Sequence, residues 1–122
     1  MPHIATNYSQ YLGTVVGDGH CVALVQICSS VGHTSGWRRG DLVRGSYPPA
    51  ACIIATFNED GQYANATDGS SHAAILLFEE VNGLLVQDQW IGQPCHHRLI
   101  SFRNGEGDAC DDGDRFYLVE RP

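Results

Sequence analysis

The sequence predicts an α+β fold in which one helix packs on an antiparallel β-sheet. Residues 20–28 are the one convincing helix, because apolar residues recur there at helical spacing. After Gly45 the pattern changes to short β-type runs separated by turn residues. The chain has 122 residues, 43% of them hydrophobic, which suits one ordinary domain with a packed core. We therefore expect residues 1–122 to form a single α+β domain.

The predicted helix is apolar over most of its surface. Cys21, Leu24, Val25 and Cys28 follow the i, i+3, i+4, i+7 spacing of one face, and a second apolar face lies beside it. A helix that is apolar on most sides is buried on most sides, so we expect it at the centre of the domain.

Five β-type runs follow, at residues 52–57, 73–79, 84–90, 98–102 and 115–120. The connection between the second and third runs is short, which predicts a hairpin with Asn82-Gly83 at the bend. Residues 58–71 are rich in Gly, Asn, Asp and Ser, and we expect them to form an exposed loop.

Charge and hydropathy argue against several classes of protein. The chain has 14 acidic and 7 basic residues, and a net charge of −7 disfavours electrostatic binding of nucleic acid. No stretch approaches the roughly 20 apolar residues of a membrane helix. Residues 1–12 lack the basic start and apolar centre of a signal peptide. We expect no nucleic-acid partner, no membrane insertion and no signal peptide.

Cys21 is the candidate nucleophile. The chain has five cysteines, and since structural disulfides use them in pairs, at least one thiol is expected to be free. Gly17-Asp18-Gly19 leads into the helix, with Asp18 or Gly19 near the cap, so Cys21 lies in the first turn. Unpaired backbone N–H groups and the helix dipole favour the thiolate there. The alternative is a small buried cysteine that only packs, as we expect for Cys28.

His72 is the candidate general acid among six histidines, because it opens an apolar strand whose small residues would let a helix start approach. His20 is adjacent to Cys21 and points about 100° away on the helix. His96 and His97 are expected to be surface or substrate-contacting residues. The alternative for His72 is a solvated histidine at a strand end.

The partner strand of the hairpin supplies the group that orients the imidazole. Asp88 and Gln89 both lie in range of His72 but point to opposite faces of the sheet. Asp88 is preferred, because a carboxylate stabilises imidazolium better than an amide does. Gln89 is the alternative, either as the orienting group or as an oxyanion donor near Cys21.

Metal binding is not expected. Cys95, His96 and His97 are consecutive, and neighbouring side chains on a strand point to opposite faces. Residues 108–113 partly resemble a calcium loop, but Cys110 takes a ligand position and Val119 stands where the closing Glu belongs. The acidic stretch 106–114 is expected to be a solvated loop.

Three motifs together resemble a known family. Gly-Asp-Gly-His-Cys-Val-Ala-Leu-Val contains Cys21, Ser-His-Ala-Ala-Ile-Leu-Leu contains His72, and Val-Gln-Asp-Gln-Trp contains Asp88. In this order they resemble the papain-like amidases of the CHAP and NlpC type, and more closely the small amidase effectors of type VI secretion. The resemblance covers about residues 17 to 102. Asp88 stands where relatives have Glu, His or Asn, and the tail after Arg103 has no counterpart.

The resemblance implies a cysteine amidase that cleaves peptidoglycan stem peptides, with a papain-like or NlpC-type core and no cofactor. Its catalytic residues would be Cys21, His72 and Asp88, and the bond favoured is the crosslink between diaminopimelate and D-Ala. The residues expected to contact substrate or oxyanion are Gln89, Trp90, Trp37 and Gly19.

The same resemblance implies a route and partners. The protein would be made in a bacterial cytoplasm, carried by a type VI secretion apparatus and act in the periplasm of a target cell, while a cognate immunity protein protects the producer. In that oxidising compartment, Cys95 and Cys110 are one pairing that would pin the acidic tail to the sheet. Cys28 and Cys52 are expected to be buried thiols.

A different class of function is a cell-wall or protein binding module without catalysis. Trp37, Trp90, Tyr47 and Tyr63 would suit the lining of a sugar or peptide groove as well as a catalytic cleft.

Overall fold

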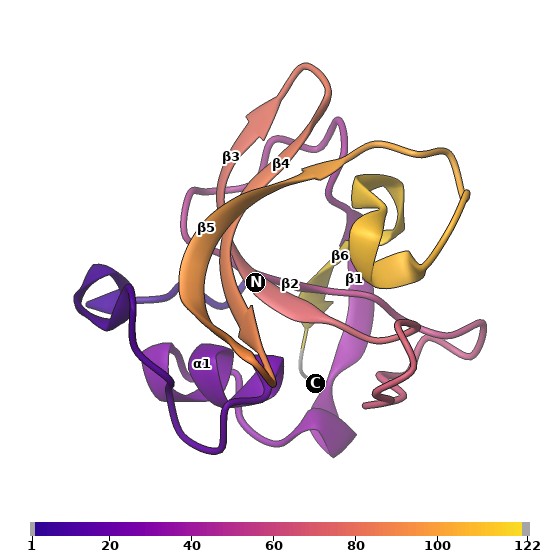
Figure 1. The fold of residues 1–122 in the computed structure, drawn as a ribbon. Helices are drawn as coiled ribbons and strands as arrows, with labels where there is room; N and C mark the ends of the chain where they lie inside the picture. Colours follow the sequence, from indigo (N-terminus) through magenta and orange to yellow (C-terminus); the bar gives the residue numbers. More distant parts are fainter. Residues whose placement is uncertain (1, 121–122) are drawn as a thin grey trace.

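The computed structural model describes residues 2–120, and within them one α-helix accompanies a six-stranded antiparallel sheet (Figure 1). The helix is α1 (Cys21–Cys28), and the order of strands in the sheet is β1-β6-β2-β3-β4-β5. The strands are β1 (Arg38–Leu42), β2 (Ile53–Ala55), β3 (Ala73–Glu80), β4 (Gly83–Trp90), β5 (Gln93–Ser101) and β6 (Tyr117–Glu120). The described residues also contain four short 3-10 turns: η1 (Tyr8–Tyr11), η2 (Thr34–Gly36), η3 (Ala109–Asp111) and η4 (Gly113–Arg115). The predicted α+β class is confirmed.

The two central strands, β2 and β3, are apolar on both faces because each face is covered by a hydrophobic cluster. Ile53 and Ile75 belong to the cluster that packs with α1, whereas Ile54 and Ala74 belong to a second cluster on the opposite face. Side chains alternate between the faces of a strand, so a continuous apolar run fills two cores at once. The sheet is strongly curved, most visibly along β4 and β5 (Figure 1).

The helix packs on one face of the sheet. Leu24, Val25 and Cys28 are buried, and α1 contacts β3 and β4. Ile27, on the other side of the helix, is 51% exposed. The predicted burial on most sides is therefore not met at Ile27, while the buried face of the helix packs on the sheet. No helix within residues 2–120 is long and apolar enough to span a membrane.

Two tight hairpins join β3, β4 and β5. The first is the predicted hairpin, but the bend is Val81-Asn82, and Gly83 already pairs with Glu80. A Cβ atom on Gly83 would lie 2.6 Å from the carbonyl oxygen of Ile100, so this strand position requires glycine. The second bend brings β5 back along β4 from Gln93, earlier than the predicted start at residue 98.

The C-terminal tail is part of the sheet. β6 lies between β1 and β2, and β1 itself was not predicted because its sequence is polar and mostly exposed. Asp112 is fully buried and accepts hydrogen bonds from the backbone N–H groups of Arg103, Gly105 and Asp114. The prediction of a solvated loop at residues 106–114 is therefore wrong at its centre, where a carboxylate organises the chain before β6.

Candidate active site

Cys21 is the first residue of α1. His20 is the N-cap, in place of the predicted Asp18 or Gly19, and its backbone N–H donates to the Asp18 carboxylate at 3.0 Å. The first backbone N–H groups of a helix have no partner within it, and the helix dipole places positive potential there. The thiol of Cys21 is thus located where a thiolate is stabilised.

Gln89 holds the loop that precedes the helix. Its Oε1 accepts from the backbone N–H of Val16 at 2.9 Å, and its Nε2 donates to the carbonyl oxygens of Val16 at 2.8 Å and His20 at 2.9 Å. The side chain is fully buried. Both amide hydrogens are used, so Gln89 fits neither predicted alternative, as an oxyanion donor or as the group that orients His72. It fixes the start of α1 against β4.

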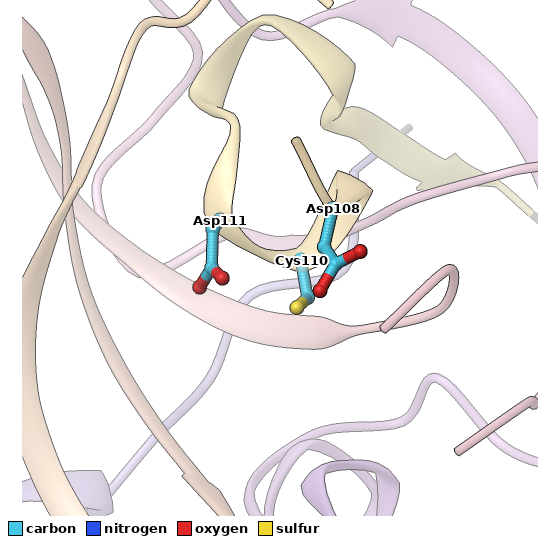
Figure 2. Close-up of side chains that lie close together, drawn as sticks. All are labelled: Asp108, Cys110 and Asp111. Atoms are coloured by element: carbon cyan, nitrogen blue, oxygen red, sulfur yellow. The ribbon is translucent and has the colours of Figure 1, made fainter. Parts of the chain in front are cut away.

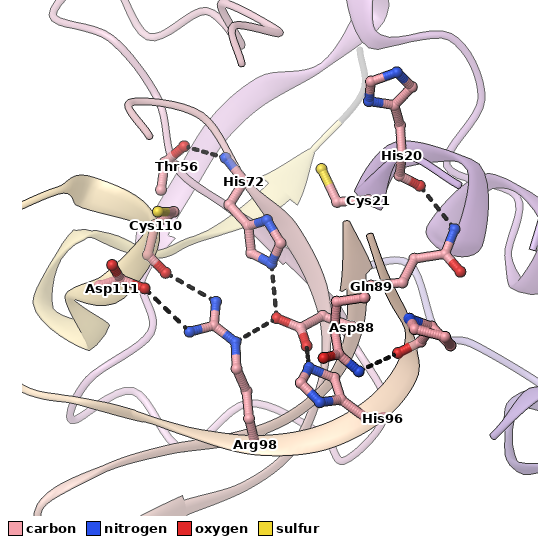
Figure 3. A network of polar contacts seen from close by, with 12 residues as sticks. His20, Cys21, Thr56, His72, Asp88, Gln89, His96, Arg98, Cys110 and Asp111 are labelled. Atoms are coloured by element: carbon pink, nitrogen blue, oxygen red, sulfur yellow. Dashed lines mark hydrogen bonds and ion pairs between the residues drawn. The ribbon is translucent and has the colours of Figure 1, made fainter. Parts of the chain in front are cut away.

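His72 and Asp88 form a buried pair on the opposite face of the sheet from Gln89. His72 precedes β3 directly and is 4% exposed, and Asp88 on β4 is fully buried. Their Nε2 and Oδ2 atoms are 2.7 Å apart. Nε2 is thus used by Asp88, and the Cys21 thiol lies near the His72 ring (Figure 3).

The surroundings of Cys21 favour its thiolate. Burial raises the pKa of the thiol, but the hydrogen bond and positive charge of His72 outweigh it, and the Tyr63 hydroxyl and the Ala73 backbone N–H add to the effect, so the pKa lies below its ordinary value. The sulfur lies 3.6 Å from the Tyr63 hydroxyl oxygen. Tyr63 is 8% exposed although it belongs to the predicted exposed loop, and the sequence suggested it only as a groove-lining aromatic residue, not as a contact of Cys21.

The imidazole of His72 favours its protonated form. Burial lowers its pKa, but the hydrogen bond to Asp88 and the interaction with Cys21 raise it to about 9. Burial likewise raises the pKa of Asp88, and the hydrogen bonds and charges of His72 and Arg98 lower it below its ordinary value. The three groups together therefore suit a thiolate, an imidazolium and a carboxylate at neutral pH.

Two residues of β5 also contact Asp88. Arg98 donates from Nε to Oδ2 of Asp88 at 2.7 Å. Nε2 of His96 lies 3.0 Å from Oδ1, close enough for an ion pair, although the angles are not those of a hydrogen bond and neither atom has another partner. The register between β4 and β5 explains why these residues meet. Asp88 pairs with His96 and Val86 pairs with Arg98, so the four side chains share one face of the sheet.

A cleft of about 400 Å³ opens over this group. Cys21, His72 and Trp90 line it, as do residues from the loop 66–71. Cys110 and Asp111 from η3 form a further part of the wall, so the tail that had no counterpart in the motifs contributes to the site. Trp90 is 41% exposed and lines the cleft, and its contact with substrate stays a prediction.

Other predicted contact residues lie elsewhere. Trp37 is fully buried and packs against Tyr63 with ring centroids 4.8 Å apart and the ring planes tilted by 53°. Its indole N–H donates to the carbonyl oxygens of Val31 and Gly32. Trp37 is therefore a core residue and cannot touch substrate. The backbone N–H of Gly19 donates to the Val16 carbonyl, which removes it as an oxyanion donor.

All five cysteines belong to the described part of the chain, and all are free. Cys95 is buried in the cluster that packs with α1, whereas Cys110 lines the cleft, so the Cys95–Cys110 pairing does not form. Cys28 and Cys52 are the buried thiols that the sequence predicted, and burial raises the pKa of both.

Within residues 2–120, Asp108, Cys110 and Asp111 bring three possible metal-ligand atoms within 4.8 Å of one another (Figure 2). Asp111 already forms an ion pair with Arg98 at 3.3 Å. Burial and the neighbouring Asp111 raise the pKa of the Cys110 thiol, whereas a zinc ligand must be a thiolate and calcium prefers oxygen. These donors do not fit a metal site.

Fold and site together define a class: a small α+β protein with a thiol, an imidazole and a carboxylate at one cleft, as in cysteine amidases and peptidases. The family model described as domesticated amidase effector 2 matches residues 3–119. The type VI secretion amidase effector 2 protein of Salmonella typhi is 38% identical over 93 residues, which cover 74% of this chain and 68% of that protein. The solved structure of type 6 secretion amidase effector 2 (Tae2) matches with a TM-score of 0.80 and 28% identity, over 98% of this chain and 94% of that one.

The chain belongs to the domesticated amidase effector 2 family. The predicted kinship with small type VI secretion amidase effectors is confirmed, and with it the prediction of a peptidoglycan amidase in place of a binding module without catalysis.

Proposed function

We propose that the protein is a cysteine amidase with a papain-like core, which cleaves amide bonds of peptidoglycan stem peptides through Cys21, His72 and Asp88. One observation carries this proposal: a buried imidazole lies between the thiol and a buried carboxylate, with its pKa raised to about 9, at the floor of a cleft. A nucleophile, a base and an orienting group in series are the minimal set for acyl transfer.

In the first half of the reaction the Cys21 thiolate attacks the carbonyl carbon of the scissile amide. The tetrahedral oxyanion is stabilised by the backbone N–H of Cys21 at the positive end of α1. His72, as imidazolium, then donates its proton to the departing amine, which a neutral imidazole could not do. The C–N bond breaks, and the acyl group stays on the sulfur as a thioester.

In the second half a water molecule replaces the amine in the cleft. The neutral His72 accepts one proton from this water as its oxygen attacks the thioester carbonyl, and the C–S bond breaks with Cys21 leaving as thiolate. The new carboxylic acid releases the second proton to solvent and departs as carboxylate. Asp88 keeps the ring orientation through both halves, because its hydrogen bond holds Nε2 and leaves Nδ1 as the nitrogen available for proton transfer.

The bond proposed for cleavage is the crosslink between diaminopimelate and D-Ala. Purified sacculi digested by the wild-type protein should lose crosslinked muropeptide dimers and gain monomers, as followed by chromatography and mass spectrometry. Products cut between D-Glu and diaminopimelate would instead place the protein in the other specificity group and refute this assignment.

As a secreted effector, the protein is proposed to act in the periplasm of a target cell and to be blocked by a cognate immunity protein that fills the cleft. Expression in a bacterium with an added export signal should cause lysis, while expression without it should not. Lysis should disappear with His72→Ala and persist with Cys28→Ala, whose sulfur is buried and outside the cleft. Equal lysis by the His72→Ala variant would contradict the proposed role.

A further inference from the structure

The side chain of Arg98 joins three separate parts of the site (Figure 3). Its Nε donates to Oδ2 of Asp88 at 2.7 Å, its Nη2 donates to the carbonyl oxygen of Cys110 at 3.0 Å, and its Nη1 donates to Oδ1 of Asp111 at 3.3 Å. The guanidinium also lies 5.0 Å from the centre of the Trp90 ring. One arginine thus links the buried carboxylate, the η3 turn and a wall of the cleft.

The position of Asp88 makes this link consequential. Its carboxylate is fully buried, and a buried charge is costly unless it is paired and hydrogen-bonded. Oδ2 accepts both from His72 and from Arg98, so the two donors fix the plane of the carboxylate. Oδ1 faces only His96, without hydrogen-bond geometry. Arg98 is therefore the permanently charged partner of Asp88, since histidines titrate and arginine does not.

We propose that Arg98 is a positioning residue of this amidase, which keeps Asp88 ionised and correctly oriented against His72 and ties the η3 turn to the cleft. The proposal rests on the proposed function of the Cys21–His72–Asp88 group. Arg98 itself lines the cleft, but its three hydrogen bonds go to Asp88, Cys110 and Asp111, so the role we assign to it is exerted through Asp88 and η3.

An arginine suits this position for a geometric reason. Its planar fork presents N–H groups in several directions at once, whereas a lysine offers a single charged centre on a flexible stem. The contacts to Cys110 and Asp111 lie on a different side of the guanidinium from the contact to Asp88. A lysine at position 98 would keep the positive charge near Asp88 but would not hold all three partners.

The charged groups around the pair set the sign of the expected effect. Asp88 faces His72 from the start of β3 and His96 and Arg98 from β5, and Arg98 in turn faces Asp111 from η3. His72 faces Cys21 from α1, and Cys21 faces Tyr63. Without Arg98, Asp88 takes up a proton at higher pH and supports the imidazolium less well at acidic pH. The Cys21 thiolate then forms at higher pH.

The test measures the rate of alkylation of Cys21 by iodoacetamide against pH, with peptide mapping by mass spectrometry so that only Cys21 is followed. In Arg98→Gln the midpoint for thiolate formation should rise by about one pH unit, the scale expected for loss of a nearby charge. Arg44→Gln is the matched control, because Arg44 pairs with Asp114 at 2.8 Å away from the cleft. An unchanged midpoint in folded Arg98→Gln overturns the proposal.

Arg98→Lys separates charge from geometry and serves also if Arg98→Gln does not fold. Its alkylation midpoint should stay at the wild-type value, while kcat on muropeptides should fall about tenfold because the bonds to η3 are lost and the site is misplaced. A wild-type kcat in Arg98→Lys would show that Arg98 has a merely structural role. The same conclusion would follow if the substitution lowered only the thermal stability. Alkylation needs no substrate, so these midpoints remain informative even if the proposed peptidoglycan bond is wrong.

Discussion

At the scale of single residues, the choice between Asp88 and Gln89 is decided by alternation along β4. Asp88 points to the face that His72, His96 and Arg98 share, and Gln89 points to the loop before α1. These two adjacent polar residues of β4 therefore have different roles. Asp88 is a candidate for orienting the imidazole, whereas Gln89 fixes the backbone that carries the nucleophile.

Asp88→Asn tests the electrostatic part of the site. The imidazolium of His72 is present below its pKa of about 9, so wild-type kcat/KM should hold up to that pH and fall above it. The substitution removes the negative charge beside the ring, which lowers the pKa of His72 and moves the alkaline limb to lower pH. Activity at neutral pH should also fall about a thousandfold or more, as when a triad carboxylate is lost.

Asp112→Asn is the matched control for that substitution, since Asp112 is also fully buried but binds backbone N–H groups outside the cleft. Asp112→Asn should lower the free energy of unfolding and leave the pH dependence of kcat/KM unchanged. An alkaline limb that stays at the wild-type pH in Asp88→Asn would contradict the proposed pairing of His72 with Asp88.

Local signals in the sequence predicted Cys21, His72 and Asp88 because each lies at a boundary that pattern can locate. A glycine loop precedes the helix, an apolar run begins after His72, and Asp88 interrupts an apolar run on the partner strand. Tyr63 and Arg98 gave no such signal. Tyr63 reaches the site through packing of the loop 58–71. Arg98 reaches it from β5, which begins earlier than the sequence pattern predicts.

At the scale of elements, the start of α1 depends on a contact with β4 that is distant in sequence. Gln89 satisfies the backbone groups of Val16, which is itself buried, and the carbonyl of the helix N-cap. The hydrogen bonds of one amide thereby determine where the first helical turn lies relative to His72.

Gln89→Met keeps the size of the side chain and removes these hydrogen bonds. Leaving the buried Val16 groups unpaired should lower the free energy of unfolding by about 3 kcal/mol, measured by urea denaturation. Activity should fall as well, because Cys21 shifts relative to His72. Gln93→Met is the control, as Gln93 donates only to the neighbouring Pro94 carbonyl, and it should change stability by less than about 0.5 kcal/mol. Equal effects of the two substitutions would contradict an anchoring role for Gln89.

Elements with strong patterns were predicted with their neighbours, and weakly patterned ones were missed. The β3–β4 hairpin follows from two apolar runs with a short connection, and the structure contains it. β1 was missed because Arg38, Arg39 and Asp41 give no alternation of apolar residues. Its place at the sheet edge comes from pairing with β6, which is a tertiary contact that a local window does not contain.

At the scale of the whole molecule, the tail closes the sheet and shapes the cleft. β6 joins the outer strand β1 to the rest of the sheet, and η3 contributes to the wall over the site. The motifs covered only the middle of the chain, so the sequence predicted a strand at 115–120 without its position in the sheet. Because β6 is an interior strand near the C-terminus, the sheet is complete only when the tail has docked.

Val119→Asp tests this dependence, because Val119 on β6 is fully buried. A charge placed there should destabilise the protein by more than about 3 kcal/mol and abolish cooperative thermal unfolding followed by circular dichroism. Leu99→Asp, at a 40% exposed position of β5, should unfold like the wild type. A stable and active Val119→Asp variant would mean that the tail is only an appendage.

The Cys21 thiolate is the proposed nucleophile of a peptidoglycan amidase. Release of muropeptides from purified sacculi by the wild type, Cys21→Ala and Cys28→Ala tests this claim most directly, since the two substitutions remove sulfur atoms from opposite ends of the same helix. We predict full loss of release with Cys21→Ala and near wild-type release with Cys28→Ala, both proteins being folded. Release by Cys21→Ala at the wild-type rate would contradict the claim.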